Sequence, residues 1–256
     1  MRIAIVASLA LSAAFANAGT LLGIDNNGIY KINTATGAST LAASMAGHGT
    51  GDTNGLAYNQ STNTAYFQRN SKLWSVNLGT GTFTQTSYTI GDAASATFYN
   101  GAYYYGTGNL IKKVDFVGAS PSTVKTFSKS FGYGDIATTA AGMMYGSSDG
   151  TIFRSDLTAV GNSYTSLNTS GKQLQLGFIG GSLYGIATGN AGSTTGGLYS
   201  INTLTGVQTA LGVTAMYNGH ALAIRDAAGM QAVPEPTTIA ALGLGALGLL
   251  KRRRKA

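Results

Sequence analysis

Between Gly19 and Ala232, the chain alternates short apolar or aromatic segments with clusters of Gly, Asn, Asp and Thr. The segments show almost no helical period, and the only proline among them is Pro121. Short alternating segments between turn-forming residues predict β-strands joined by tight turns. The apolar and aromatic content is too high for a disordered linker. We therefore expect an all-β body.

One pattern recurs along this body. An aliphatic, an aromatic, a polar and a second aliphatic residue are followed by Asn and then by Thr-Gly. The clear copies are Ile29–Asn33, Leu73–Asn77 and Leu198–Asn202, and looser copies begin at Ile111 and Ile152. Other strand candidates precede and follow each copy, which makes four strands per repeat. A period of about 40 residues with four strands is typical of β-propeller blades.

The repeat predicts a five-bladed β-propeller. Four complete blades are expected at residues 54–90, 94–130, 134–170 and 174–214. Thr20–Ala43 supplies only three further strands. We predict that Ala221–Arg225 is the innermost strand of the fifth blade, so that strands from the two ends of the chain pair and close the ring. A β-sandwich or an irregular β-solenoid of the same strands is the alternative.

The residues of the repeat have structural roles. Asn or Asp ends the strand, Thr-Gly forms the turn, and the aromatic residue packs between neighbouring blades. The pattern resembles the Leu-Tyr-x-Ile-Asp-x-x-Thr-Gly type of repeat in secreted bacterial propellers. This resemblance implies a propeller fold, and it does not imply a catalytic activity.

The N-terminus has the form of a secretory signal peptide. Met1 and Arg2 precede an apolar stretch, Ile3–Phe15, and Ala16-Asn17-Ala18 places small residues where signal peptidase requires them. We expect cleavage after Ala18, which makes residues 1–18 the signal peptide and 19–230 the propeller-like domain. The alternative is a buried N-terminal helix.

The C-terminus, residues 231–256, combines three features in order. A rigid motif, Val233-Pro234-Glu235-Pro236, is followed by an apolar helix at 237–250 and a basic stop, Lys251-Arg252-Arg253-Arg254-Lys255. The helix has 14 residues, fewer than the roughly 20 that usually span a bilayer. We expect it to be a transient transmembrane helix whose basic end stays in the cytoplasm.

This tail resembles the PEP-CTERM sorting signal, which the membrane protease exosortase recognises. The resemblance implies export across the inner membrane, a transient tether there, and release to the cell surface or the extracellular space. Signal peptidase and exosortase are then the processing partners. The resemblance also links the protein to exopolysaccharide and biofilm, which makes exopolysaccharide the partner expected for the body.

Composition removes several classes of function. The formal charge of +7 comes largely from Arg2 and the terminal bases, and the body holds ten basic and eight acidic residues. Its basic residues form no cluster of the kind that binds nucleic acid. The chain has no cysteine, which excludes disulfides, thiol nucleophiles and Cys-ligated metals. We expect no cofactor and no enzymatic activity.

The candidate ligand site is the mouth of the propeller channel, where loops lead into the innermost strands. These loops supply His48, Asp52, Asp135 and His220. Two histidines and an aspartate suit a divalent metal, whereas exposed loop histidines without a ligand are the alternative. The sequence therefore leaves the metal unassigned.

Two functions follow from this pattern. The first is a non-enzymatic binding or adhesion module associated with exopolysaccharide, with aromatic residues such as Tyr104 and Tyr133 as candidates to stack on sugar rings. The alternative is a propeller-type hydrolase or lyase that uses His48, Asp135 and His220 at the channel mouth.

Overall fold

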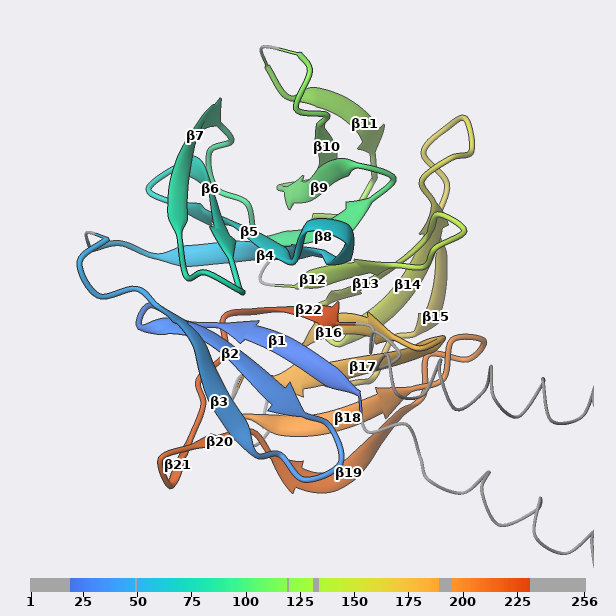
Figure 1. Cartoon of the computed structure of the whole chain (residues 1–256). Coiled ribbons are helices and arrows are strands. Elements are labelled where there is room, and N and C mark those ends of the chain that lie inside the picture. Colours follow the sequence, from blue (N-terminus) through green and yellow to red (C-terminus); the bar gives the residue numbers. More distant parts are fainter. Residues whose placement is uncertain (1–18, 49, 119, 131–133, 189–194, 231–256) are drawn as a thin grey trace, which may run out of the picture.

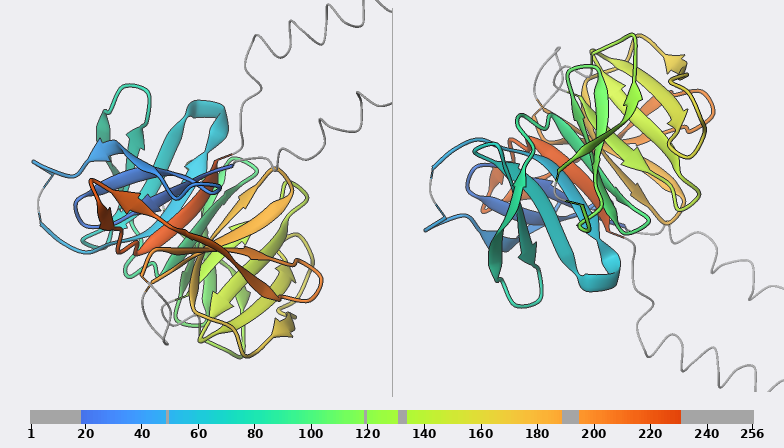
Figure 2. Two further views of the ribbon diagram at one scale, coloured as in Figure 1. Left: turned by 90° about the horizontal axis from the view of Figure 1, so that it is seen from below. Right: turned by 90° about the horizontal axis from the view of Figure 1, so that it is seen from above.

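The computed structural model describes residues 19–48, 50–118, 120–130, 134–188 and 195–230. Five antiparallel four-stranded sheets surround one axis, as Figures 1 and 2 show. The predicted five-bladed propeller is confirmed. The predicted signal peptide and the predicted transmembrane helix lie outside the described residues. Within the described ranges, no helix has the length and apolar character needed to cross a membrane.

Each blade is one sheet whose strands follow the chain from the axis outward, and blade 1 also takes one strand from the C-terminal end. Blade 1 contains β22 (Asp226–Met230), β1 (Thr20–Ile24), β2 (Gly28–Asn33) and β3 (Ser39–Ser44). Blade 2 contains β4 (Thr53–Asn59), β5 (Thr64–Arg69), β6 (Lys72–Asn77) and β7 (Phe83–Thr89). Blade 3 contains β8 (Ser95–Tyr99), β9 (Ala102–Thr107), β10 (Leu110–Val114) and β11 (Ser122–Thr126).

Blade 4 contains β12 (Asp135–Thr138), β13 (Met143–Ser148), β14 (Thr151–Asp156) and β15 (Thr165–Asn168). Blade 5 contains β16 (Leu174–Ile179), β17 (Ser182–Ala187), β18 (Gly197–Ile201) and β19 (Gln208–Thr214). The remaining elements are a 3-10 turn, η1 (Gln60–Thr62), and a ribbon of β20 (Met216–Tyr217) and β21 (His220–Ala221). The predicted extents of the four complete blades agree with these sheets.

The repeated Asn forms the same turn in its three clear copies. The side-chain oxygens of Asn33, Asn77 and Asn202 each accept hydrogen bonds from the backbone N–H groups two and three residues later. The glycine that follows in each copy has φ between +70° and +72°, a conformation that glycine adopts without steric cost. The repeated sequence therefore ends the third strand of a blade and directs the chain into the fourth.

Apolar side chains fill the spaces between blades. The described residues form five buried clusters, one at each interface between neighbouring blades. Residues of neighbouring blades that belong to the same cluster are Ile29 and Phe67, Leu73 and Tyr105, Ile111 and Met144, Ile152 and Leu174, and Ile186 and Tyr30. Each blade thus buries both faces of its sheet, and the fifth interface exists only because the ring is closed.

Closure comes from antiparallel pairing of β22 with β1. Thr20 lies opposite Met230, and Ile24 lies opposite Asp226. The two ends of the described body therefore leave it side by side (Figure 1).

The closing strand differs from the predicted one. The sequence predicts Ala221–Arg225, whereas β22 is Asp226–Met230. Leu222 and Ile224 are buried between blades 5 and 1, where large apolar side chains fit. The contact between the closing strand and β16 has room only for small residues, which Ala228 and Gly229 provide. The closing strand is therefore determined by side-chain volume, which the pattern of apolar residues does not show.

β16 and β22 approach too closely for a side chain at the contact. A Cβ on Gly229 would lie 2.0 Å from the backbone oxygen of Phe178, and a Cβ on Gly177 would lie 2.8 Å from the backbone nitrogen of Gly229. This contact closes one side of the channel.

Gly229→Ala should lower the free energy of unfolding by about 2 kcal/mol or more, because the new methyl group meets backbone that cannot rotate away. Gly118→Ala is the matched control, since a Cβ there meets only Asp115 Oδ1 at 3.4 Å. Urea denaturation of the two variants checks the prediction. Equal stability of both would contradict the close contact.

Candidate functional site

The central channel opens into a cavity at each end. The end where the innermost strands begin holds a cavity of about 480 Å³, with Asn54, Gln175 and Arg225 in its lining. The end where these strands finish holds a cavity of about 520 Å³, which we call the exit pocket. Both volumes are within the roughly 300–1,000 Å³ typical of small-ligand sites.

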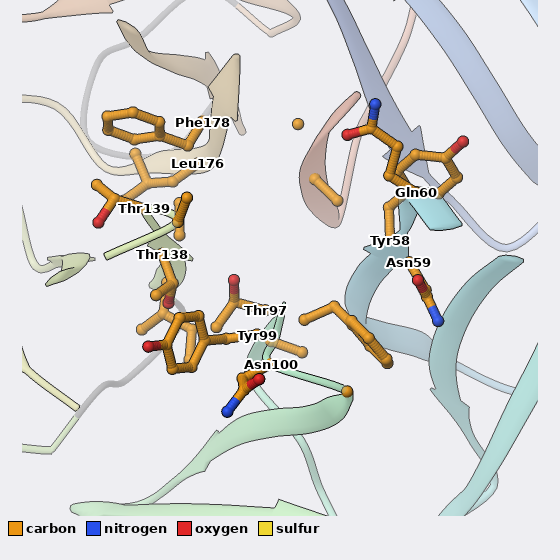
Figure 3. Close-up of a pocket in the computed structure, with 18 of the residues that line it drawn as sticks. Tyr58, Asn59, Gln60, Thr97, Tyr99, Asn100, Thr138, Thr139, Leu176 and Phe178 are labelled. Carbon is orange, nitrogen blue, oxygen red and sulfur yellow. The ribbon is translucent and has the colours of Figure 1, made fainter. Parts of the chain in front are cut away.

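All five blades contribute to the exit pocket. Its lining comes from β4 and η1, from β8 and the turn after it, from β12, from β16 and from β22. In Figure 3, Tyr58 and Gln60 lie on one side of the opening and Thr138, Leu176 and Phe178 on the other, with Tyr99 and Asn100 below. The residues that line the pocket are Tyr58, Asn59, Gln60, Ser61, Ala96, Thr97, Phe98, Tyr99, Asn100, Gly101, Ile136, Ala137, Thr138, Thr139, Ala140, Leu176, Phe178, Ala228 and Gly229.

A pair of aspartates lies at the axis between the two cavities. Asp135 begins β12 and Asp226 begins β22, and both have 0% exposure. Their carboxyl groups are hydrogen-bonded to each other. No ion pair between either aspartate and a basic residue is present in the described part of the chain. Two buried carboxyl groups without a cation repel each other when both are ionised, and a proton shared between them removes this repulsion.

Each aspartate also joins two blades. The Asp135 carboxyl accepts hydrogen bonds from the N–H groups of Ile136 and Leu176, both at 2.6 Å, which ties blade 4 to blade 5. The Asp226 carboxyl accepts from the N–H groups of Ala227 at 2.7 Å and Leu56 at 2.8 Å, which ties blade 1 to blade 2. The pair therefore connects four of the five blades near the axis.

Burial determines the ionisation of the pair. Burial is the largest cause that raises the pKa of Asp135, and the charge of Asp226 and the hydrogen bond that protonated Asp135 donates to Asp226 raise this pKa further. Burial raises the pKa of Asp226 to about 7, although hydrogen bonds from Asp135 and from backbone N–H groups act in the opposite direction. Both shifts favour the protonated form, so the folded pair retains a proton at pH values at which exposed carboxyl groups are ionised.

Tyr103 adds a buried hydroxyl near this pair. Its hydroxyl donates a 2.6 Å hydrogen bond to the backbone oxygen of Gly55 and joins blade 3 to blade 2. Burial raises its pKa, and the charges of Asp226 and Asp135 raise it further. Tyr103 therefore stays neutral and serves as a hydrogen-bond donor.

The four residues proposed from sequence occupy different places. Asp135 is buried at the axis. Asp52 forms a 2.9 Å ion pair with Arg225, which lines the cavity where the innermost strands begin. His48 stacks on Phe83 of β7 with ring centroids 4.0 Å apart, and His220 lies exposed in β21. The structure therefore does not bring His48, His220 and Asp135 together.

No group of three or more His, Asp or Glu side chains that could hold a metal ion is found in the described ranges. Of the aromatic residues considered for sugar stacking, Tyr104 packs half-buried against Tyr99 with centroids 6.2 Å apart. Tyr133 lies outside the described residues.

Sequence reasoning missed Asp226, Tyr103 and the exit pocket. A signal for Asp226 was present, because Asp135-Ile136-Ala137 and Asp226-Ala227-Ala228 share an Asp-x-Ala pattern at the start of an innermost strand. The pocket had no comparable signal, since its residues come from five separate segments.

One further motif has the spacing of a hydrolase nucleophile, Gly146-Ser147-Ser148-Asp149-Gly150. It covers the end of β13 and the turn that leads to β14, whereas that nucleophile requires a strand-to-helix turn. Ser148 has 0% exposure, and its hydroxyl donates to the backbone oxygen of Ser130 at 3.1 Å. The motif therefore has a structural role.

The aspartate pair predicts a stability that falls as pH rises. In the unfolded chain both carboxyl groups ionise near pH 4, while the folded pair keeps its proton to about pH 7 or above. The folded state then binds more protons, so the free energy of unfolding should decrease between about pH 4 and 8, by up to about 1.4 kcal/mol per pH unit. Denaturant unfolding at a series of pH values measures this slope.

Asp135→Asn should reduce the slope, because the amide does not ionise. It should also be less stable than the parent at pH 5, since an amide nitrogen cannot accept the N–H bond that a carboxyl oxygen accepts. Asp115→Asn is the control. Asp115 is exposed, and N–H bonds from Gly118 and Val117 lower its pKa, so this variant should keep the full decrease. A parent protein of constant stability from pH 5 to 8 would refute the shared proton.

Comparison with known proteins supports both the fold and the tail. Residues 232–255 match the family described as the PEP-CTERM protein-sorting motif. A comparison with curated proteins finds no match.

Two solved structures are similar to the body. An auxiliary nutrient binding protein from Bacteroides thetaiotaomicron VPI-5482 has a TM-score of 0.54 and 12% identity, over 75% of this chain and 54% of that chain. The chain thus spans about half the length of that protein. A chain of the nidogen/laminin complex has a TM-score of 0.50 and 14% identity, over 75% of this chain and 77% of that chain. At these identities, the similarity shows the fold alone.

The matched segment contains the predicted Val233-Pro234-Glu235-Pro236 motif and the basic stop at 251–255. The prediction of a PEP-CTERM sorting tail is confirmed. The motif implies an exported protein that exosortase sorts, and this chain carries it behind a five-bladed β-propeller.

Proposed function

We propose that this protein is a non-enzymatic binding module, displayed on the cell surface or released into the matrix, that associates with exopolysaccharide. The observation that carries the proposal is the exit pocket, a cavity of about 520 Å³ to which all five blades contribute. A rigid ring that ends in such a cavity suits recognition of a ligand, because little conformational entropy is lost on binding.

The sorting tail supports the location in this proposal. The motif implies export and membrane-anchored sorting, which is consistent with a body that meets extracellular polymer. One of the two similar structures is of a nutrient binding protein, and the other is of a complex between nidogen and laminin. Both of those propeller-like chains belong to proteins that bind a partner, which is consistent with a binding role for the propeller here.

Processing by signal peptidase and exosortase predicts a defined mature chain. Intact mass spectrometry of protein from the native host should find a form that begins at Gly19 and ends near 233–236, at the surface or in the medium. Replacing Pro234, Glu235 and Pro236 by alanine should leave the uncleaved form in the membrane fraction. A native form that retains Lys251–Ala256 in the membrane would make the tail a permanent anchor.

The mature protein should be retained on immobilised exopolysaccharide from its host and should release no new reducing ends from that polymer. Retention and reducing ends are measured in the same incubation. Heat-unfolded protein is the control for non-specific adhesion. Release of oligosaccharides would favour the hydrolase or lyase alternative, and absence of retention would refute the proposed partner.

A further inference from the structure

The exit pocket has an unusual chemical composition for a cavity of its size. None of its lining residues is Asp, Glu, Lys, Arg or His. The lining combines the amides of Asn59, Gln60 and Asn100 with several hydroxyl groups, and it also includes four aromatic rings. A phosphate or carboxylate ligand would lose its hydration there without gaining a cationic partner.

Several polar groups of the pocket have no partner within the described part of the chain. The side-chain amides of Gln60 and Asn100 make no hydrogen bond there. The Thr138 hydroxyl oxygen is buried and also lacks a partner. A buried hydroxyl without a partner costs about 1–3 kcal/mol, so a ligand or a water molecule that bonds it would recover free energy.

The apolar part of the lining is suited to a flat ligand with C–H faces. Tyr58, Phe98, Tyr99 and Phe178 come from three different innermost strands, β4, β8 and β16. Aromatic rings held by a sheet provide large contact areas at low cost in conformational entropy. A pyranose ring has both an apolar C–H face and a rim of hydroxyl groups, and it therefore matches the two kinds of lining.

The floor of the pocket disfavours negative charge. Ile136 and Leu176 line the pocket, and their backbone N–H groups both bond the Asp135 carboxyl. The Asp135–Asp226 pair is buried beside this floor, and ionisation of the pair can only add negative charge there, in surroundings of low dielectric constant. An anionic sugar would be repelled, whereas a neutral sugar would not.

We infer that the exit pocket binds an uncharged glycosyl unit, with hydroxyl groups bonded by Gln60, Asn100 and Thr138 and the sugar ring packed on the aromatic residues. This inference rests on the proposed association with exopolysaccharide and names the ligand class and the site.

Isothermal titration of the mature protein tests the inference. The probes are neutral tetrasaccharides of glucose, galactose and mannose, together with tetragalacturonic acid. At least one neutral probe should bind in the millimolar range or more tightly, and tetragalacturonic acid should bind at least about tenfold more weakly. Tighter binding of the acidic probe, or no binding of any neutral probe, would overturn the inference.

Two variants locate the site. Gln60→Ala should weaken binding of the neutral probe about tenfold, because one or two hydrogen bonds are lost. Gln85→Ala is the matched control, since Gln85 is an exposed glutamine on the outermost strand of the same blade. The affinity of this variant for the neutral probe should equal that of the parent protein.

Thr138→Val separates ligand binding from folding. The methyl group replaces a hydroxyl that lacks a partner, so the melting temperature should stay equal or rise while the affinity falls about tenfold. Unchanged affinity in both pocket variants would overturn the inference. If the variants still bind whole exopolysaccharide like the parent, the proposed function stands and only the site is wrong. If the parent fails to bind exopolysaccharide but binds neutral tetrasaccharides at this pocket, only the proposed partner is wrong.

Discussion

The pairing of β22 with β1 is the interaction on which the rest of the structure depends. Blades 2 to 5 follow one another along the chain, and each packs on the next through large apolar side chains. Without β22, blade 1 would have three strands and an unpaired edge, which invites association with other chains. With β22 in place, every blade has two neighbours and the channel has a complete wall.

Closing a ring of only five blades leaves little space at the axis. The chain meets this constraint in two ways. Small residues at Ala227-Ala228-Gly229 and Gly177 let β22 and β16 touch. The longer polar side chains near the axis form hydrogen bonds to neighbouring blades. Asp135, Asp226 and Tyr103 each bond backbone of a neighbouring blade. A buried carboxyl group is unfavourable when ionised, and the shared proton together with the backbone N–H bonds reduces that cost.

The same geometry relates the body to its tail. Ala228 and Gly229 line the exit pocket, and β22 ends at Met230, one residue before the C-terminal tail of residues 231–256. The chain therefore enters and leaves the propeller at the end that holds the exit pocket, because Thr20 lies opposite Met230. The Asp52–Arg225 ion pair lies at the other end, where Arg225 lines the second cavity.

The sequence by itself determined the strand repeat, the turns at Asn33, Asn77 and Asn202, the number of blades and the sorting tail, because these depend on residues close together in the chain. Only the tertiary structure decided that Asp226–Met230, and not Ala221–Arg225, closes the ring, since the choice depends on the volume left between strands from opposite ends of the chain. It also decided that Asp135 faces Asp226 and that five segments enclose one uncharged pocket. Local patterns report which residues form strands and turns, whereas the residues that meet at an axis are set by how the blades pack.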